Sequence, residues 1–179
     1  MKKILLSILC IISAFGIQAA DKKVQELSSP DGRITVTFDD FKYSITADGV
    51  KVLAPSAISM LISDGTMYGP GAKLQKTNYR SQDRTIKADV YKRSRIRDRY
   101  NEMELVYKDF SLIFRAYDEG VAYRFVSGSK KGFNVVTEKA YFTFPDNWMA
   151  YVPYLNSKKK NLEEQLFCSF ENVYSHIRI

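Results

Sequence analysis

The sequence predicts an all-β protein, specifically an antiparallel β-sandwich, and three observations support this class. Segments that alternate apolar and polar residues, such as residues 34–38 and 121–126, recur at spacings of roughly ten residues. Turn-forming Asp-Gly and Pro-Asp-Gly sequences separate several of them. The 12 Tyr and 11 Phe residues also favour strands, because aromatic side chains pack well on a pleated surface.

Turn signals divide the predicted strands. Asp-Gly at 48–49 separates two alternating segments, which is a strong hairpin signal because both residues tolerate a positive φ. Residues 63–81 contain three glycines and one proline and are predicted to be the longest loop. Asp-Glu-Gly at 118–120 marks another hairpin, and residues 158–167 are the one helical candidate, with a polar loop as the alternative. The predicted strands cover residues 34–38, 43–46, 50–53, 57–62, 85–91, 102–107, 110–117, 121–126 and 140–144.

Residues 1–19 have the features of a cleaved secretory signal. Two lysines precede an almost entirely apolar segment at residues 4–17, and Ile-Gln-Ala at 17–19 offers a cleavage site. The apolar segment is too short to span a bilayer, and no later apolar segment is long enough. We therefore expect a periplasmic or secreted protein without a membrane span, whose mature domain covers residues 20–179.

Removal of the signal changes the charge and the cysteine content. It takes away Cys10, two lysines and no acid, so the net charge falls from +7 to +5 and Cys168 remains as the lone cysteine. A lone cysteine excludes an internal disulfide and a Cys-X-X-Cys metal site. The charge excess is mild and indicates no particular partner.

Four arginines stand at every second position, at Arg93, Arg95, Arg97 and Arg99. In an extended strand their side chains share one face. Such a stripe is either a polyanion-binding surface or, as we favour, a solvated strand face or an interdomain rim. Few aromatic residues lie nearby, so the pattern argues against a nucleic-acid partner.

Four short motifs carry a family resemblance. They are Ser-Pro-Asp-Gly at 29–32, Tyr-Asn-Glu at 100–102, Tyr-Asp-Glu-Gly at 117–120 and Ser-Phe-Glu-Asn-Val-Tyr at 169–174. In this order they resemble the N-terminal β-sandwich of glycoside hydrolase family 97, the α-glucosidases and α-galactosidases of Bacteroidetes. The resemblance covers residues 25–177 and implies a galactose-mutarotase-like supersandwich. We expect this sandwich to be incomplete at its C-terminus and to lack the catalytic (β/α)8 barrel of the family.

The acidic residues of these motifs are expected to have different roles. Asp118 and Glu119 are adjacent, and neighbours in a hairpin turn point apart, so we interpret them as turn residues rather than as a hydrolytic pair. Asn101 is expected to bind backbone at a strand entry, and Glu102 is assigned no catalysis. The resemblance implies that Glu171 matches a glutamate that binds calcium in the family. Calcium takes about six to eight oxygens, so Glu171 is expected to bind it only together with the barrel, and this chain alone is expected to hold no cofactor.

The aromatic residues near the C-terminus leave two interpretations open. Trp148, Tyr151 and Tyr154 form either a sugar-stacking surface or, as we favour, part of a core. His176 is the only histidine and is expected to be exposed or packed. No Ser-His-Asp arrangement is proposed, and no catalytic residue is assigned.

Two functions follow from the sequence. The first is a non-catalytic N-terminal domain or fragment of a family 97-like α-glycosidase, whose oligo- or polysaccharide substrate binds through the missing catalytic domain. The alternative is a free-standing periplasmic β-sandwich that binds carbohydrate or another protein.

Overall fold

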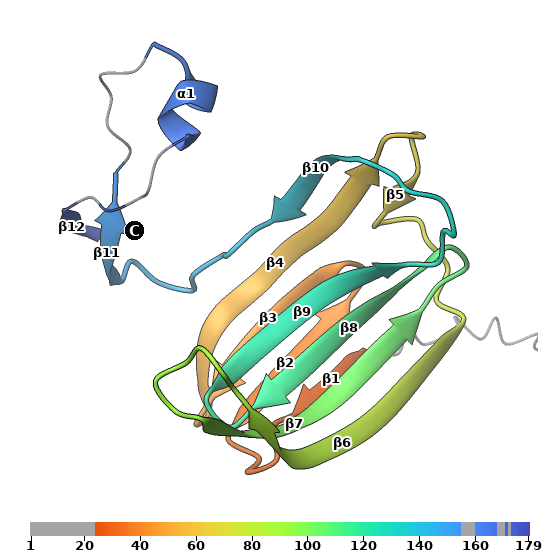
Figure 1. Cartoon of the computed structure of the whole chain (residues 1–179), viewed down its shortest axis with the longest axis horizontal. Helices are drawn as coiled ribbons and strands as arrows, with labels where there is room; N and C mark the ends of the chain where they lie inside the picture. Colours follow the sequence, from red (N-terminus) through yellow and green to blue (C-terminus); the bar gives the residue numbers. More distant parts are fainter. Residues whose placement is uncertain (1–23, 155–159, 168–170, 172) are drawn as a thin grey trace, which may run out of the picture.

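The chain forms antiparallel sheets, two of which pack face to face as a sandwich (Figure 1). The computed structural model describes residues 24–154, 160–167, 171 and 173–179. The fold class predicted from the sequence is confirmed, whereas the predicted signal at residues 1–19 and Cys168 lie outside the described residues. The elements are β1 (Gln25–Ser28), β2 (Ile34–Asp39), β3 (Lys42–Ala47), β4 (Val50–Ile62), β5 (Met67–Tyr68), β6 (Lys76–Lys87), β7 (Arg95–Val106), β8 (Phe110–Tyr117), β9 (Gly120–Ser127), β10 (Val135–Ala140), β11 (Met149–Pro153), α1 (Leu162–Leu166) and β12 (Tyr174–Arg178).

The first sheet has the strand order β1-β2-β3-β4-β10, and β5 pairs with β4. The predicted hairpin at Asp48-Gly49 is confirmed, with φ values of 49° and 79°. The prediction of separate strands at 50–53 and 57–62 is wrong, because β4 continues through Pro55. Around this proline the register with β3 shifts, and such an irregularity tolerates a residue that has no N–H to donate.

The second sheet has the strand order β6-β7-β8-β9, with antiparallel neighbours throughout. The predicted loop at 63–81 is too long, since it includes β5 and the first part of β6. The predicted strand at 85–91 ends at Lys87 instead. β6 is polar and lies at the edge of the sheet, so its side chains show no apolar alternation even though its backbone pairs fully with β7.

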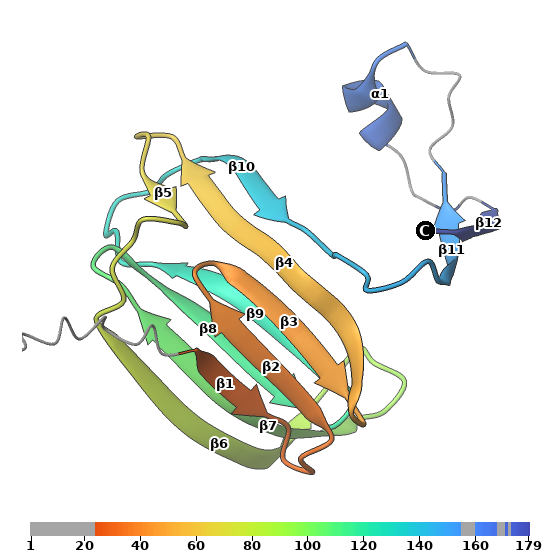
Figure 2. The same cartoon turned by 180° about the vertical axis from the view of Figure 1, so that it is seen from behind.

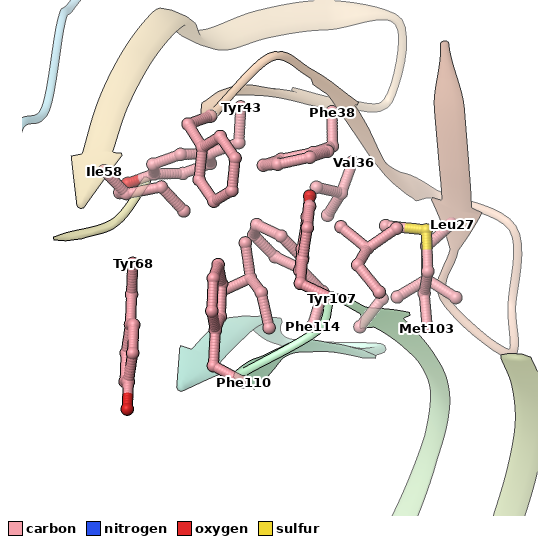
Figure 3. Packing of buried hydrophobic residues seen from close by; sticks show 14 of the residues in the cluster. Leu27, Val36, Phe38, Tyr43, Ile58, Tyr68, Met103, Tyr107, Phe110 and Phe114 are labelled. Atoms are coloured by element: carbon pink, nitrogen blue, oxygen red, sulfur yellow. The ribbon is translucent and has the colours of Figure 1, made fainter. Parts of the chain in front are cut away.

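Side chains from both sheets fill the space between them (Figure 3). Alternate residues of each strand point inward, as the two-residue period requires. Aromatic rings form much of this core, and Phe110 stacks on both Tyr68 and Tyr107, at centroid distances of 4.5 and 4.6 Å. The buried residues of the core are Leu27, Val36, Phe38, Phe41, Tyr43, Leu53, Ile58, Ile62, Tyr68, Met103, Leu105, Tyr107, Phe110, Leu112, Phe114 and Ala116.

β10 pairs with β4 in the first sheet, and the chain after β10 extends away from the sandwich, as Figures 1 and 2 show from opposite sides. The strand predicted at 140–144 is displaced: β10 covers Val135–Ala140, and one isolated bridge joins Ala54 to Thr143. The β11–β12 pair was not predicted. α1 lies within the predicted helical segment and begins at the N-cap Asn161, whose side chain accepts a hydrogen bond from the Glu164 N–H. No helix in the described part of the chain has the length and apolarity to cross a membrane.

Candidate functional site

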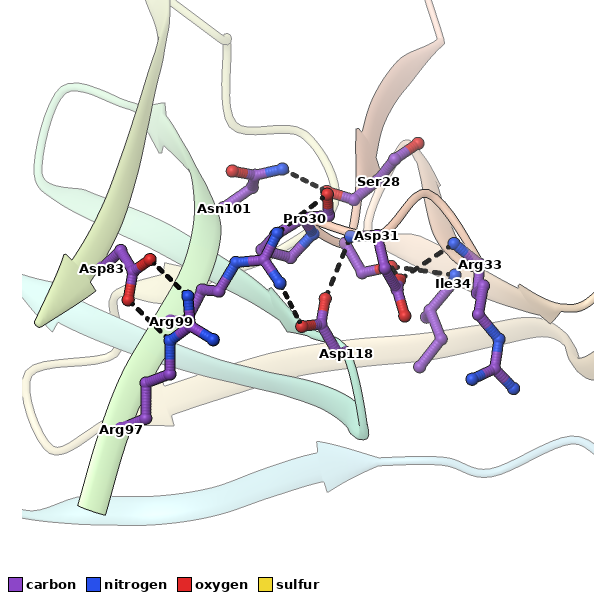
Figure 4. Close-up of polar contacts among 11 residues, drawn as sticks. Ser28, Pro30, Asp31, Arg33, Ile34, Asp83, Arg97, Arg99, Asn101 and Asp118 are labelled. Carbon is purple, nitrogen blue, oxygen red and sulfur yellow. Dashed lines mark hydrogen bonds and ion pairs between the residues drawn. The ribbon is translucent and has the colours of Figure 1, made fainter. Parts of the chain in front are cut away.

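Three motifs of the resemblance meet at one end of the sandwich (Figure 4). The Asp118 carboxylate accepts hydrogen bonds from the Arg99 guanidinium at 2.9 Å and from the Asp31 backbone N–H at 3.0 Å. Arg99 also donates to the Pro30 carbonyl at 3.4 Å, and the Asn101 side chain donates to the Ser28 carbonyl at 2.8 Å. Asp118 therefore joins the β8–β9 turn to the turn before β2, which is the structural role expected of it.

Glu102 forms a second polar cluster on the outer face of the second sheet. Its carboxylate is buried and accepts hydrogen bonds from Arg80, at 2.5 and 3.0 Å, and from Arg115, at 2.7 Å. The Arg115 guanidinium also lies 4.2 Å from the centroid of the Tyr100 ring. Burial raises the pKa of Glu102, but the two arginines outweigh that effect and hold the pKa below its usual range.

The Glu102 cluster was not predicted from the sequence. Tyr-Asn-Glu at 100–102 was expected at a strand entry, but it lies in the middle of β7. Arg80 and Arg115 pair directly opposite Glu102 across β6 and β8. Finding this arrangement requires the strand register, which the polar sequence of β6 does not reveal.

The arginine stripe does not form as a single row. Arg93 lies in the turn between β6 and β7, so the extended geometry begins only at Arg95. Arg97 pairs with Asp83, with hydrogen bonds of 2.9 and 2.7 Å, and Arg99 binds Asp118. Two of the four guanidinium groups are therefore paired with acids, one on β6 and one in the β8–β9 turn.

Glu171 is exposed and lies outside the sandwich strands, shortly before β12. The residues next to it in its motif, 169–170 and 172, are outside the described part. Within that part, no three or more Asp, Glu, His or Cys side chains gather as metal ligands. The assignment of Glu171 to a calcium site therefore stays a prediction.

The three aromatic residues near the C-terminus do not form one stacking platform. Trp148 is half-buried beside Phe144, with centroids 6.0 Å apart. Tyr151 stacks on His176 at 4.4 Å, because β11 and β12 pair these two residues. Tyr154 is exposed. The interpretation of these residues as sandwich core is wrong, because β11 and β12 pair only with each other in the described structure.

The fold and these motifs together define an N-terminal sandwich domain of a glycoside hydrolase. The family profile described as "Glycosyl-hydrolase 97 N-terminal" matches residues 27–179. The chain therefore belongs to this family, and the predicted resemblance is confirmed.

Individual relatives agree with this assignment. The chain is 42% identical over 180 residues to the retaining alpha-galactosidase of Bacteroides thetaiotaomicron, and the match covers 98% of this chain but 27% of the relative. In fold it is similar to a family 97 enzyme of Pseudoalteromonas sp. strain K8 in complex with panose, with a TM-score of 0.64 at 19% identity, covering 86% of this chain and 24% of that enzyme. It is also similar to a beta-arabinopyranosidase, with a TM-score of 0.68 at 22% identity, covering 84% and 26%.

Proposed function

We propose that this chain acts as the non-catalytic N-terminal domain of a family 97 α-glycosidase, and that hydrolysis of an α-galactoside or related sugar needs the rest of such an enzyme. One observation carries the proposal: the chain matches the N-terminal part of the family and spans 27% of the length of a retaining alpha-galactosidase.

The chemistry of the acidic residues supports the same conclusion. Retaining hydrolysis needs two carboxyl groups about 5 to 5.5 Å apart, one of which must stay protonated to act as the acid. In this chain, hydrogen bonds and neighbouring charges instead lower the pKa of Asp31, Asp48, Asp64, Asp83 and Glu102. Carboxyl groups held in the ionised form are poor proton donors, so these residues suit a scaffold better than an acid catalyst.

Hydrolysis of an aryl α-galactoside tests the proposal. We expect the chain alone to leave the substrate at the buffer rate. A fusion in which this chain replaces the matching segment of the Bacteroides thetaiotaomicron alpha-galactosidase should turn it over. Turnover by the chain alone, lost on Asp118→Asn or Glu119→Gln, would contradict the proposal.

Glu171 is proposed as the contribution of this domain to a calcium site of the complete enzyme. The support is the motif match at 169–174. One carboxylate cannot replace the hydration shell of calcium, so the other ligands must come from the rest of the enzyme. We expect calorimetry to detect no binding tighter than millimolar in the chain alone. The fusion should bind calcium and lose affinity on Glu171→Gln, with Glu163→Gln as the matched control on α1. Unchanged affinity in the Glu171 variant would remove the assignment.

A further inference from the structure

The positive charge of the chain is concentrated on one hairpin, which β6 and β7 form. Residues 83–99 contain seven Lys or Arg residues and three Asp residues, so this segment has a net charge of +4. The basic residues are Arg84, Lys87, Lys92, Arg93, Arg95, Arg97 and Arg99. The predicted mature domain carries +5 in all, so its remaining residues are together close to neutral.

This hairpin extends beyond the end of the sandwich. β6 and β7 pair along their full length, but β8 pairs with β7 only at residues 100–106. Residues 83–87 and 95–99 therefore pair with each other and with no third strand of the described structure. The Ala88 N–H donates to the Ser94 carbonyl at 3.0 Å and closes the turn. Figures 1 and 2 show this turn as a loop that protrudes past the neighbouring strands, so it can reach a surface that the sandwich itself does not touch.

Two apolar side chains stand at the tip of the turn. Val90 is fully exposed and Tyr91 is 66% exposed, so nothing in the described part of the chain covers them. Single exposed apolar residues are ordinary, but these two are adjacent and protrude. An aliphatic side chain gains free energy on leaving water for a bilayer interface. A tyrosine ring suits the same interface because its hydroxyl group can stay among the headgroups.

Three basic side chains beside this tip have no acidic partner in the described part of the chain. The acids of the hairpin are paired within it, as Arg97–Asp83, Arg84–Asp98 and Lys87–Asp89. Arg99 binds Asp118 outside the hairpin. The basic residues that remain are Lys92, Arg93 and Arg95, and all three are exposed. Their charges are therefore available to an external anion.

A bilayer matches this combination of apolar and basic residues better than a soluble polyanion does. A sulfated or carboxylated polysaccharide offers charges to the cations but no apolar layer to Val90. An anionic bilayer offers both, since its headgroups carry the charge and its acyl chains lie just beneath them.

We propose that the hairpin tip, residues 88–95, binds the surface of a membrane that contains anionic lipids. Val90 and Tyr91 enter the interface, and the three free cations contact the headgroups. The binding is peripheral, because the tip is far too short to cross a bilayer. The proposal goes beyond the proposed function, since it concerns what holds the protein in place and not which bond is hydrolysed.

Sedimentation with lipid vesicles tests the proposal. Because an apolar signal segment would itself bind lipid, the vesicles should receive protein recovered after export, without residues 1–19. It should sediment with vesicles of phosphatidylethanolamine and phosphatidylglycerol and stay in solution with neutral phosphatidylcholine. Each Lys or Arg near an anionic surface strengthens binding about fivefold, so loss of all three free cations should weaken binding roughly a hundredfold. The variant that removes them is Lys92→Gln with Arg93→Gln and Arg95→Gln.

The matched control removes three exposed lysines at the opposite end of the second sheet. It is Lys108→Gln with Lys130→Gln and Lys131→Gln, since these residues follow the far ends of β7 and β9. This control has the same net charge as the hairpin variant and should bind vesicles like the unsubstituted protein. An equal loss in both variants would show attraction by net charge alone and would overturn the proposal, as would failure of the unsubstituted protein to sediment with anionic vesicles.

The apolar tip is tested with all charges kept. Val90→Ser with Tyr91→Ser should weaken vesicle binding about tenfold, because less apolar surface enters the interface. The control pair is Val136→Ser with Tyr141→Ser, which are also exposed and should leave binding unchanged. Heparin serves as a soluble polyanion for comparison. If the tip variant binds vesicles as well as the unsubstituted protein does, and both bind heparin equally, the hairpin binds polyanions in general and the proposal is wrong.

The fusion with the rest of the Bacteroides thetaiotaomicron alpha-galactosidase shows whether the tip stays available in a complete enzyme. It should sediment with anionic vesicles and depend on the three cations and on Val90 and Tyr91 as the chain alone does. This result is independent of whether the fusion hydrolyses an aryl α-galactoside, so failure of the proposed function is distinguished from failure of the membrane proposal. If the chain alone sediments and the fusion does not, the rest of the enzyme covers the tip and the proposal is overturned.

Discussion

Residues 24–127 and 128–179 are both rich in aromatic side chains, yet among the described residues only the first segment buries them fully. Among the described residues, every buried side chain lies between Leu27 and Ala116. In the first segment two sheets cover each other's inner faces. In the second, β10 adds a strand to the edge of the first sheet, and β11 and β12 pair only with each other among the described strands. A sheet of two strands is only marginally stable by itself. Alternation of apolar and polar residues therefore predicts where a strand forms, but it does not show whether a second layer covers the apolar face of that strand.

Paired substitutions in the two segments should give the largest contrast. Phe114 is fully buried and packs within 6 Å of the Phe38, Tyr43 and Tyr123 rings. Phe114→Ala should lower the free energy of unfolding by about 3 to 5 kcal/mol, because it leaves a cavity. Phe142 is exposed, so Phe142→Ala in the chain alone should change it by less than about 0.5 kcal/mol. Denaturant unfolding of both variants measures the difference, and similar losses would show that Phe142 is covered.

The same contrast explains how much the sequence predicted. Alternation with Asp-Gly turns correctly identified β2, β3 and the β8–β9 hairpin, because these strands have one buried and one exposed face. It missed the extent of β6, which is stabilised by full pairing with β7 although its side chains are polar. It placed Asp118 correctly in a turn but not its contact with Asp31, because that contact depends on how two sheets pack.

Buried and exposed ion pairs provide a second, smaller contrast. Glu102→Gln replaces the buried carboxylate with an uncharged amide, so Arg80 and Arg115 lose their charged partner. This substitution should lower the free energy of unfolding by about 2 kcal/mol. Asp83→Asn breaks the Arg97 pair, in which both side chains are more than half exposed, and should have no measurable effect because solvent already screens the pair. If urea unfolding shows that Glu102→Gln and Asp83→Asn lower the unfolding free energy equally, burial does not decide how much these ion pairs contribute.

The Glu102 contribution should also depend on pH. Its pKa is lowered in the folded protein from an ordinary value of 4.5. The stabilisation is therefore fully present above that value and is lost as the pH falls through the lower folded pKa. The difference in unfolding free energy between the wild-type chain and Glu102→Gln should be largest near pH 7 and shrink toward pH 3. A constant difference would mean that the substitution acts through packing alone.

The smallest expected effect concerns the turn that joins the two sheets. Asp118→Asn keeps an oxygen that can accept from the Asp31 N–H but loses the charge that pairs with Arg99. Both partners of this ion pair are about one third exposed, so the loss should be about 0.5 to 1 kcal/mol. Glu119→Gln is the matched control, because the neighbouring Glu119 is exposed and should contribute nothing measurable. If Glu119→Gln costs as much as Asp118→Asn in urea unfolding, the turn does not join the sheets through Asp118. If the two differ and the α-galactosidase fusion keeps its turnover in both variants, the Asp-Glu-Gly motif serves the fold rather than the reaction.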